Sequence, residues 1–142
     1  MIRQEFLLLA DGAEAVNGKI YILGGGMDRY HARSFPVALK ADVALGILVG
    51  WTETNSRHSL QLKFMDEDSN PVIGIEAEFE VGRPAGAKPG QDIRNLLAIK
   101  GPFLIPKPGA YKLMISLNGE DQDPPFRFWV DQADVPEPAV AG

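Results

Sequence analysis

Glycine and proline interrupt this sequence so often that little room remains for helices. The chain carries 15 glycines and 11 prolines in 142 residues, and they divide it at intervals of about 8 to 14 residues. That spacing is typical of short strands joined by tight turns. The sequence therefore predicts an all-β fold.

Two pairs of segments alternate apolar and polar residues as a half-buried strand requires. Leu60–Met65 and Val72–Val81 are joined by turn-forming residues, which predicts a hairpin. Tyr111–Leu117 and Phe126–Val130 alternate in the same way on either side of a polar loop that contains an Asn-Gly pair. Because this dipeptide tolerates positive φ, we expect a second hairpin there.

The remaining segments are apolar on both faces or ambiguous. Glu5–Ala10 and Lys19–Leu23 flank a loop that ends in Asn-Gly, and we interpret them as another hairpin. Leu39–Trp51 predicts a long strand, and Arg29–Phe35 predicts a short edge strand. Ile93–Ile99 would also suit a short helix. We favour a strand, because its neighbours are all strands and a meander would need one between the two alternating hairpins.

Together these segments predict seven to nine antiparallel strands in a two-sheet, immunoglobulin-like β-sandwich. A closed barrel is the alternative. The length of 142 residues fits a single core, and we assign residues 1–131 to one domain. Residues 132–142, which include Pro136 and Pro138, are expected to form a disordered tail.

Charge and composition exclude several classes of partner. Lysine and arginine total 14 against 19 acidic residues, the net charge is −5, and no basic stripe offers a surface for nucleic acid. The absence of cysteine excludes disulfides and thiol catalysis, and it fits a reducing compartment. The apolar run Phe6–Ala10 is too short for a secretory signal or a membrane helix. We therefore expect a cytoplasmic protein that binds neither nucleic acid nor membrane.

No pattern in the sequence predicts catalysis, a cofactor or a metal. Gly24–Gly26 follows a predicted strand, but it lacks the Lys-Ser/Thr pair and the helix that a phosphate-binding loop requires. His31 and His58 lie far apart and outside any metal-binding spacing. No serine occupies a nucleophile elbow. We expect that the protein is not an enzyme.

Loops that combine charged, amide and aromatic side chains form a candidate site for a small polar ligand, a sugar or a metal ion. These residues are Asp28, Arg29, His31, Trp51, Glu53, Asn55 and His58. Binding of such a ligand at one end of the sandwich is the alternative function.

The main functional hypothesis comes from apolar residues that alternate with the expected core residues. We expect the core to contain Phe6, Leu8, Ile20, Ile22, Ile47, Leu113 and Phe128. The outward set is then Leu7, Leu9, Tyr21, Leu23, Leu48, Met114 and Trp129. Unless the loop after Arg83 or the tail covers them, such a patch marks a partner surface, and a second copy is the commonest partner. We therefore expect a non-enzymatic interaction module that forms a homodimer, with an unknown protein partner as a second candidate.

Several stretches of the chain resemble a known family. Phe6–Asp11, Asn17–Asp28, Trp51–Asn55 and the closing Pro-Gly-x-Tyr at Pro108–Tyr111 are similar to a family of small bacterial proteins of unknown function. The resemblance covers about residues 3 to 130. It implies a single-domain β-sandwich and supplies no catalytic residues.

Overall fold

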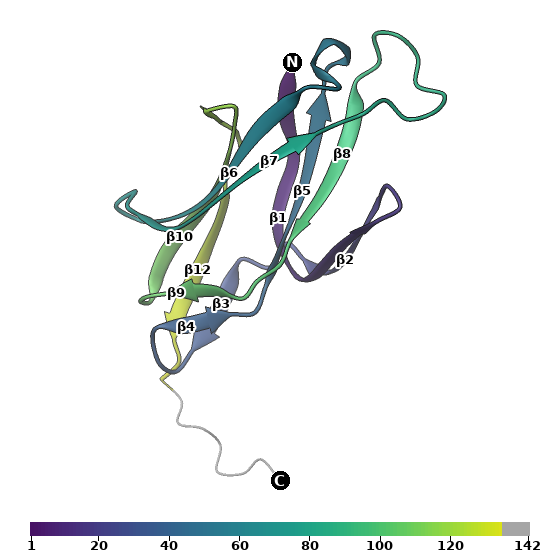
Figure 1. Ribbon diagram of the computed structural model, residues 1–142. Coiled ribbons are helices and arrows are strands. Elements are labelled where there is room, and N and C mark those ends of the chain that lie inside the picture. Colours follow the sequence, from purple (N-terminus) through teal and green to yellow (C-terminus); the bar gives the residue numbers. More distant parts are fainter. Residues whose placement is uncertain (135–142) are drawn as a thin grey trace.

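The computed structural model describes residues 1–134, which form twelve strands and one short 3₁₀ segment, η1 (Trp51–Glu53), in an all-β fold (Figure 1). Across sheet A the strands are β2 (Lys19–Gly25), β1 (Ile2–Val16), β5 (Asp42–Val49) and β8 (Ile93–Ile99). Across sheet B they are β3 (Arg29–Ala32), β12 (Phe126–Gln132), β10 (Gly109–Leu117), β6 (Arg57–Asp66) and β7 (Pro71–Glu80). In addition, β11 (Glu120–Asp121) pairs with β10, and β4 (Val37–Leu39) pairs with β9 (Phe103–Ile105) as a third, two-stranded sheet.

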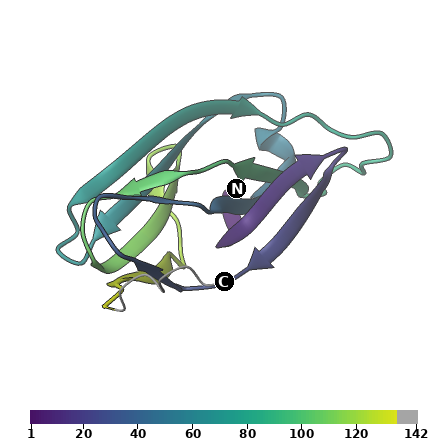
Figure 2. The same cartoon turned by 90° about the horizontal axis from the view of Figure 1, so that it is seen from below.

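Sheets A and B share one hydrophobic core. Leu45 and Ile47 of β5 are fully buried, and so are Leu62 and Phe64 of β6. The β4–β9 pair contributes Phe103, whose ring centroid lies 4.7 Å from that of Phe64. Seen from below, the hairpin of β1 and β2 is set to one side of the other strands (Figure 2).

Tight turns end the strands at the expected Asn-Gly pairs. Asn17 and Gly18 join β1 to β2 with φ values of 52° and 75°, and Asn118 and Gly119 follow β10 with 51° and 84°. Two successive residues with positive φ are the signature of a type I′ turn, in which asparagine and glycine are least strained. A hairpin forms at Asn17-Gly18 as predicted, but Lys19–Leu23 pairs with Gly12–Val16 from the expected loop, whereas Phe6–Ala10 pairs with β5. The hairpins β6–β7 and β10–β12 pair as expected.

The number of strands and sheets differs from the prediction. The structure has twelve strands in three sheets instead of seven to nine strands in two, and the immunoglobulin-like pattern is not confirmed. The additional strands β4, β9 and β11 have three, three and two residues. Segments this short show no alternation that a sequence pattern could reveal.

The partner of β8 also differs from the expected one. Ile93–Ile99 is a strand, as we favoured, but it pairs with β5 in sheet A. The expected meander between the two alternating hairpins is therefore wrong, because those hairpins belong to sheet B. At the other end of the chain, β12 includes Gln132, and Ala133 N donates to Ala32 O at 2.7 Å, so strand pairing continues past residue 131. Residues 135–142 of the predicted tail lie outside the described part.

A β-bulge near the N-terminus decides which face of β1 meets the core. Gln4 pairs with Ile47, but the next pair is Phe6 with Gly46, so one extra residue, Glu5, is inserted between them. An inserted residue moves all following side chains to the opposite face. As a consequence, Leu9 is fully buried in the core.

The bulge reverses the predicted orientation of the N-terminal strand. Leu7 packs against the core, and Leu9 is part of it, although both were expected to face outward. Phe6 and Leu8, which were expected in the core, lie on the outer face of sheet A. Phe6 is paired there with Gly46, and Leu8 is paired with Ala44.

Candidate functional site

An exposed two-stranded arm projects from sheet A (Figure 1). Strand β5 pairs with β1 only as far as Ala10, whereas β2 pairs with β1 from Ala10 to Val16. Beyond Ala10, β1 therefore has β2 as its ladder partner and no other among the described strands. We call residues 11–25 the arm.

Apolar side chains occupy both faces of the arm. Tyr21 and Leu23 are 59% and 74% exposed, and Ile22 on the opposite face is 39% exposed. Val16, at the tip, is 40% exposed. An isolated hairpin is only marginally stable in water, and an unpaired apolar edge strand is a site of association. We therefore expect association with a partner to stabilise the arm more than any other part of this fold.

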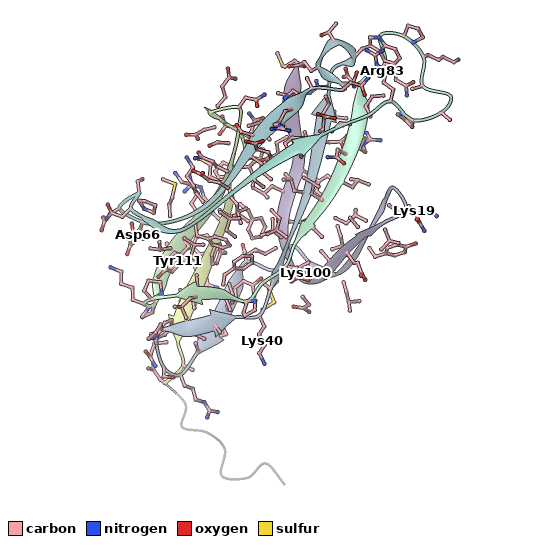
Figure 3. The ribbon with its side chains drawn as sticks, viewed as in Figure 1. Lys19, Lys40, Asp66, Arg83, Lys100 and Tyr111 are labelled. Carbon is pink, nitrogen blue, oxygen red and sulfur yellow. The ribbon has the colours of Figure 1, made fainter. Side chains whose placement is uncertain are left out.

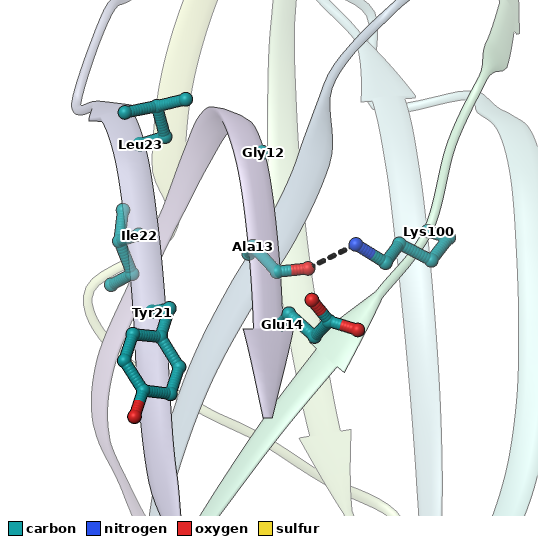
Figure 4. Close-up of a pocket in the computed structure, with 7 residues that line it drawn as sticks. All are labelled: Gly12, Ala13, Glu14, Tyr21, Ile22, Leu23 and Lys100. Atoms are coloured by element: carbon teal, nitrogen blue, oxygen red, sulfur yellow. Dashed lines mark hydrogen bonds between the residues drawn. The ribbon is translucent and has the colours of Figure 1, made fainter. Parts of the chain in front are cut away.

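A shallow hollow of about 410 Å³ lies along the arm, between β2 and the end of β8 (Figure 4). Its lining includes Glu14, the three consecutive apolar residues at positions 21–23, and Lys100. The ammonium group of Lys100 donates to Ala13 O and also contacts Asp42 Oδ2 at 3.1 Å. Lys100 thus ties the base of the arm to the rest of sheet A.

Asp42 is the centre of that attachment. Its carboxylate accepts hydrogen bonds from Ala13 N and Gly101 N, both at 3.0 Å, and its side chain is 15% exposed. Partial burial by itself raises the pKa of Asp42, but the two backbone N–H donors and the ammonium group of Lys100 outweigh that effect. The pKa therefore lies below its ordinary value.

The outer face of sheet A continues the apolar surface of the arm. Because residues directly opposite each other share a face, the registers place on it Phe6, Leu8, Leu48, Leu96, Tyr21 and Leu23. The first four are half-buried. Sheets with one solvated face ordinarily carry polar residues there, so this face is unusually apolar.

Two ion pairs border that face at the N-terminal end of β1. Arg94 contacts Glu5 through Nε and Nη2, both at 2.6 Å, and Arg3 contacts Asp92 at 3.3 Å. The hydrogen bonds from Arg94 hold the pKa of Glu5 below its ordinary value. An apolar centre with a charged border is the usual composition of a protein interface.

Apart from Leu7 and Leu9, which pack in or against the core, the expected interface residues fall on two different surfaces. Tyr21 and Leu23 are exposed on the arm, as expected, and Leu48 lies half-buried on the same face of sheet A. Met114 and Trp129 lie on the outer face of sheet B, where Trp129 is 36% exposed and stacks against Arg29.

The predicted ligand-binding residues occupy two separate ends of the molecule. Asp28, Arg29 and His31 lie at β3, beside β12, where Arg29 pairs with Asp131 at 2.9 Å. The others surround η1, at the opposite end in Figure 1. These others are Trp51, Glu53, Asn55 and His58. The structure does not bring the two groups together.

His58, which is 6% exposed, has both ring nitrogens engaged by protein groups. Nε2 lies 2.7 Å from Glu53 O, and Nδ1 lies 3.0 Å from Asn118 Nδ2. A carbonyl oxygen can only accept, so Nε2 carries the proton and Nδ1 accepts from the amide. This arrangement makes His58 part of the structural support of η1.

Arg83 packs against η1 at the same end of the molecule, where Figure 3 shows it beside the long loop after β7. Its guanidinium carbon lies 3.7 Å from the ring centroid of Trp51. Its Nε donates to Thr54 Oγ1 at 2.7 Å, and its Nη2 donates to Trp51 O at 2.8 Å. Trp51 is therefore covered by an intramolecular partner.

Reasoning from the sequence missed Phe6, Leu8 and Leu96 as outward apolar residues. The run from Phe6 to Ala10 is apolar at every position, so alternation does not reveal which residues face the core. Gln4, the polar residue before this run, gives no signal either, because it is buried in the structure and donates through Nε2 to Pro124 O at 2.9 Å.

A family model matches residues 5–125, and its description is a family of unknown function, DUF6941. The chain belongs to this family. The expected resemblance to a family of unknown function is thereby confirmed. No curated protein matches the chain.

Two further findings concern residues 1–134. No helix in this part is long and apolar enough to cross a membrane. Nor does it contain a group of three or more histidine and carboxylate side chains placed to hold a metal ion.

Proposed function

We propose that the protein is an interaction module that self-associates through the arm and the adjoining outer face of sheet A. The observation that carries this proposal is the exposure of Tyr21 and Leu23 on an edge strand whose ladder partner, within residues 1–134, is β1 alone. Burial of these side chains against a second copy would remove apolar surface from water. At about 25 cal/mol per Å², such burial favours association.

Symmetry favours a closed dimer over an open chain. Strand β2 is the terminal strand of sheet A, so a second copy can approach it along a two-fold axis. In that arrangement each copy presents the same residues to the other, which is the commonest form of self-association. We therefore infer a homodimer in which the two arms lie against each other.

We also infer that the module has no catalytic activity of its own. Supporting this inference, His58 is held by Glu53 O and Asn118, and His31 lies at the far end of the fold. General acid–base chemistry needs such a group within hydrogen-bond reach of other reactive groups in one pocket. Turnover of a substrate that is lost in a His31→Ala or His58→Gln variant would contradict the inference.

Light scattering coupled to size-exclusion chromatography tests self-association directly. The wild-type chain is expected to elute with a mass near twice its 15.5 kDa at about 100 μM and to dissociate on dilution. A Tyr21→Lys/Leu23→Lys variant is expected to be a monomer, because it places two charges in the contact.

Leu104→Lys is the matched control. Leu104 is also 59% exposed, but it lies on β9 in the third sheet, so the variant is expected to remain a dimer. A wild-type monomer at this concentration, or a dimer unaffected by the two arm substitutions, would sink the proposal. Circular dichroism verifies that each variant keeps its fold.

A further inference from the structure

Among residues 1–134, a second surface without a strand partner lies between β7 and β8, and its lining shares Lys100 with the hollow along the arm. Strand β7 is the terminal strand of sheet B and β8 is the terminal strand of sheet A. An apolar groove of about 400 Å³ separates them, with Leu60 and Leu62 of β6 also in its lining. In this region the two sheets do not cover each other completely.

The two faces of β7 differ sharply in character. Its register with β6 places Ile75 opposite Leu62 and Ala77 opposite Leu60, so these side chains point toward the groove. Ile75 is 36% exposed even though it faces the inner side of the sheet. The alternate residues Glu76, Glu78 and Glu80 face the other way and are exposed, and Glu78 contacts Arg57 at 3.3 Å while Glu76 accepts from Gln61 at 2.9 Å.

This alternation specifies the kind of segment that β7 can accept. A strand added to a sheet edge places successive side chains on alternate faces, in step with its neighbour. One set would enter the groove between β7 and β8, and the other would lie beside the row of glutamates. Apolar residues suit the first set, and lysine or arginine suits the second.

We propose that the outer edge of β7, which has no ladder partner among residues 1–134, binds an extended segment of a partner protein in which apolar and basic residues alternate. The apolar side chains fill the groove against Ala77 and Leu97, and the basic side chains pair with Glu76, Glu78 and Glu80. Backbone hydrogen bonds to β7 add a sixth main strand to the path of sheet B. This inference is independent of self-association through the arm.

The acidic row also discriminates against the wrong occupants. Two copies that paired through β7 would place glutamates beside glutamates, and like charges across strands are destabilising. Strand β3 has the required alternation of basic and apolar residues, but it has only four residues, and its Arg29 is already paired with Asp131. β7 has ten residues, so a longer segment from another protein fits it better than a second copy does.

Three synthetic peptides with blocked termini serve as probes. The first is an octapeptide of alternating valine and lysine, and the second has the same composition with the valines and lysines in two blocks. The third alternates valine and glutamate. Fluorescence anisotropy of labelled peptides measures affinity at low salt. We expect the first peptide to bind about tenfold or more tightly than the other two, because it alone satisfies both faces of β7.

Charge reversal provides the decisive comparison. The variant Glu76→Lys/Glu78→Lys is expected to lose affinity for the valine–lysine peptide and to gain affinity for the valine–glutamate peptide. Its matched control, Asp28→Lys/Asp134→Lys, has the same change in net charge. Asp28 lies next to β3 and Asp134 just beyond β12, at the opposite edge of sheet B, so this control is expected to retain the wild-type preference.

Hydrogen exchange tests the backbone contact. Amides of β7 are expected to become protected when the valine–lysine peptide binds, and a peptide N-methylated at every second residue is expected to bind weakly. Ala77→Asp, which places a charge in the groove, is expected to abolish binding without changing the circular dichroism spectrum.

Four outcomes would overturn the proposal. The first is no binding of the valine–lysine peptide at about 1 mM, a concentration at which even a 4 kcal/mol interaction is detectable. The second is equal binding of the block peptide, and the third is equal weakening by the Asp28→Lys/Asp134→Lys control, either of which indicates general electrostatic attraction. The fourth is a change in oligomeric mass in the Glu76→Lys/Glu78→Lys variant, which would identify a second copy as the occupant. The first three outcomes leave self-association through the arm untouched.

Discussion

The ring of Phe6 lies directly over Gly46 on the outer face of sheet A. A Cβ atom added to Gly46 would fall 2.2 Å from Phe6 Cε2 and 2.5 Å from Cδ2. The two residues are paired across β1 and β5, so neither can move away without disturbing the sheet. This contact exists because the bulge at Glu5 turns Phe6 outward.

Gly46→Ala is therefore expected to reduce the free energy of unfolding by about 1–3 kcal/mol, since overpacking forces the ring from its position. In a Phe6→Ala background the same substitution should cost little. The coupling free energy from this double-mutant cycle, measured by urea unfolding, is expected to exceed about 1 kcal/mol. Equal costs in the two backgrounds would show that Phe6 does not occupy this site.

The N-terminal strand shows where the sequence is informative and where it is not. The Asn17-Gly18 turn follows from local backbone preferences and was predicted correctly, but the strand that pairs with Lys19–Leu23 is Gly12–Val16 and not the predicted Glu5–Ala10. The faces of Leu7 and Leu9 were predicted wrongly, because a single inserted residue reverses them and an unbroken apolar run gives no alternation to reveal it. Orientation in such a strand depends on its pairing with β5.

Strand pairing between distant segments was the other missing information. The sequence of Ile93–Ile99 suits a strand or a short helix, the strand was favoured only because its neighbours are strands, and nothing local indicates that it pairs with β5. The groove between β7 and β8 depends on this pairing and could not be predicted. By contrast, the exposed Tyr21 and Leu23 were predicted, since an apolar strand next to a tight turn is visible in the sequence itself.

Asp42 is expected to stabilise the fold by holding the base of the arm. Asp42→Asn removes the negative charge and presents an NH₂ group to at least one of three donors, so it should lower the free energy of unfolding by about 1–3 kcal/mol at pH 7. Urea unfolding measures this change. Lys100→Met, which removes one donor and keeps the backbone contacts, is the milder comparison.

The same carboxylate makes stability depend on pH in a defined direction. The pKa of Asp42 is lower in the folded state than its ordinary value of 3.8, so the unfolded chain binds the proton more readily. The contribution of Asp42 to the free energy of unfolding is complete above about pH 4 and is lost as the pH falls through the folded-state pKa. The Asp42→Asn variant should therefore lose less stability than the wild type between about pH 4 and pH 2. Parallel pH profiles for the two proteins would contradict this assignment.

Asn118 links the turn after β10 to His58 and β6. Its Nδ2 donates to His58 Nδ1 at 3.0 Å, its Oδ1 accepts from Ser59 N at 2.9 Å, and its φ is 51°. Asn118→Gly removes the two side-chain hydrogen bonds, but glycine adopts the positive φ of this position without steric strain. Asn118→Ala removes the bonds and adds backbone strain of about 1–2 kcal/mol.

We therefore expect both Asn118 variants to be destabilised, and the alanine variant to be the less stable by about 1 kcal/mol. Thermal and urea unfolding provide the comparison. Nitrogen chemical shifts of the His58 ring give an independent measurement. Without the amide donor of Asn118, Nδ1 is no longer held as an acceptor, so the proton can move from Nε2 to Nδ1 and change the tautomer. Equal stability of the two variants would show that the backbone conformation contributes little here.

Arg83 is expected to hold the loop of residues 83–91 against η1. Removal of its side chain by Arg83→Ala deletes two hydrogen bonds and the stacking on Trp51, each worth about 0.5–1.5 kcal/mol at a partly exposed site. Arg83→Lys keeps the charge, but a single ammonium group cannot reproduce the two directed bonds and the planar stacking. The loss of stability should therefore be largest for alanine and intermediate for lysine.

Local opening distinguishes this role from a general loss of stability. In a Trp129→Phe background, where Trp51 is the remaining tryptophan, Arg83→Ala should increase quenching of Trp51 fluorescence by acrylamide. Amides of residues 84–91 should exchange faster, whereas those of β5 and β10 should change only by the global stability difference. If exchange in the loop is unaltered while the whole protein is destabilised, the contact between Arg83 and Trp51 does not restrain the loop.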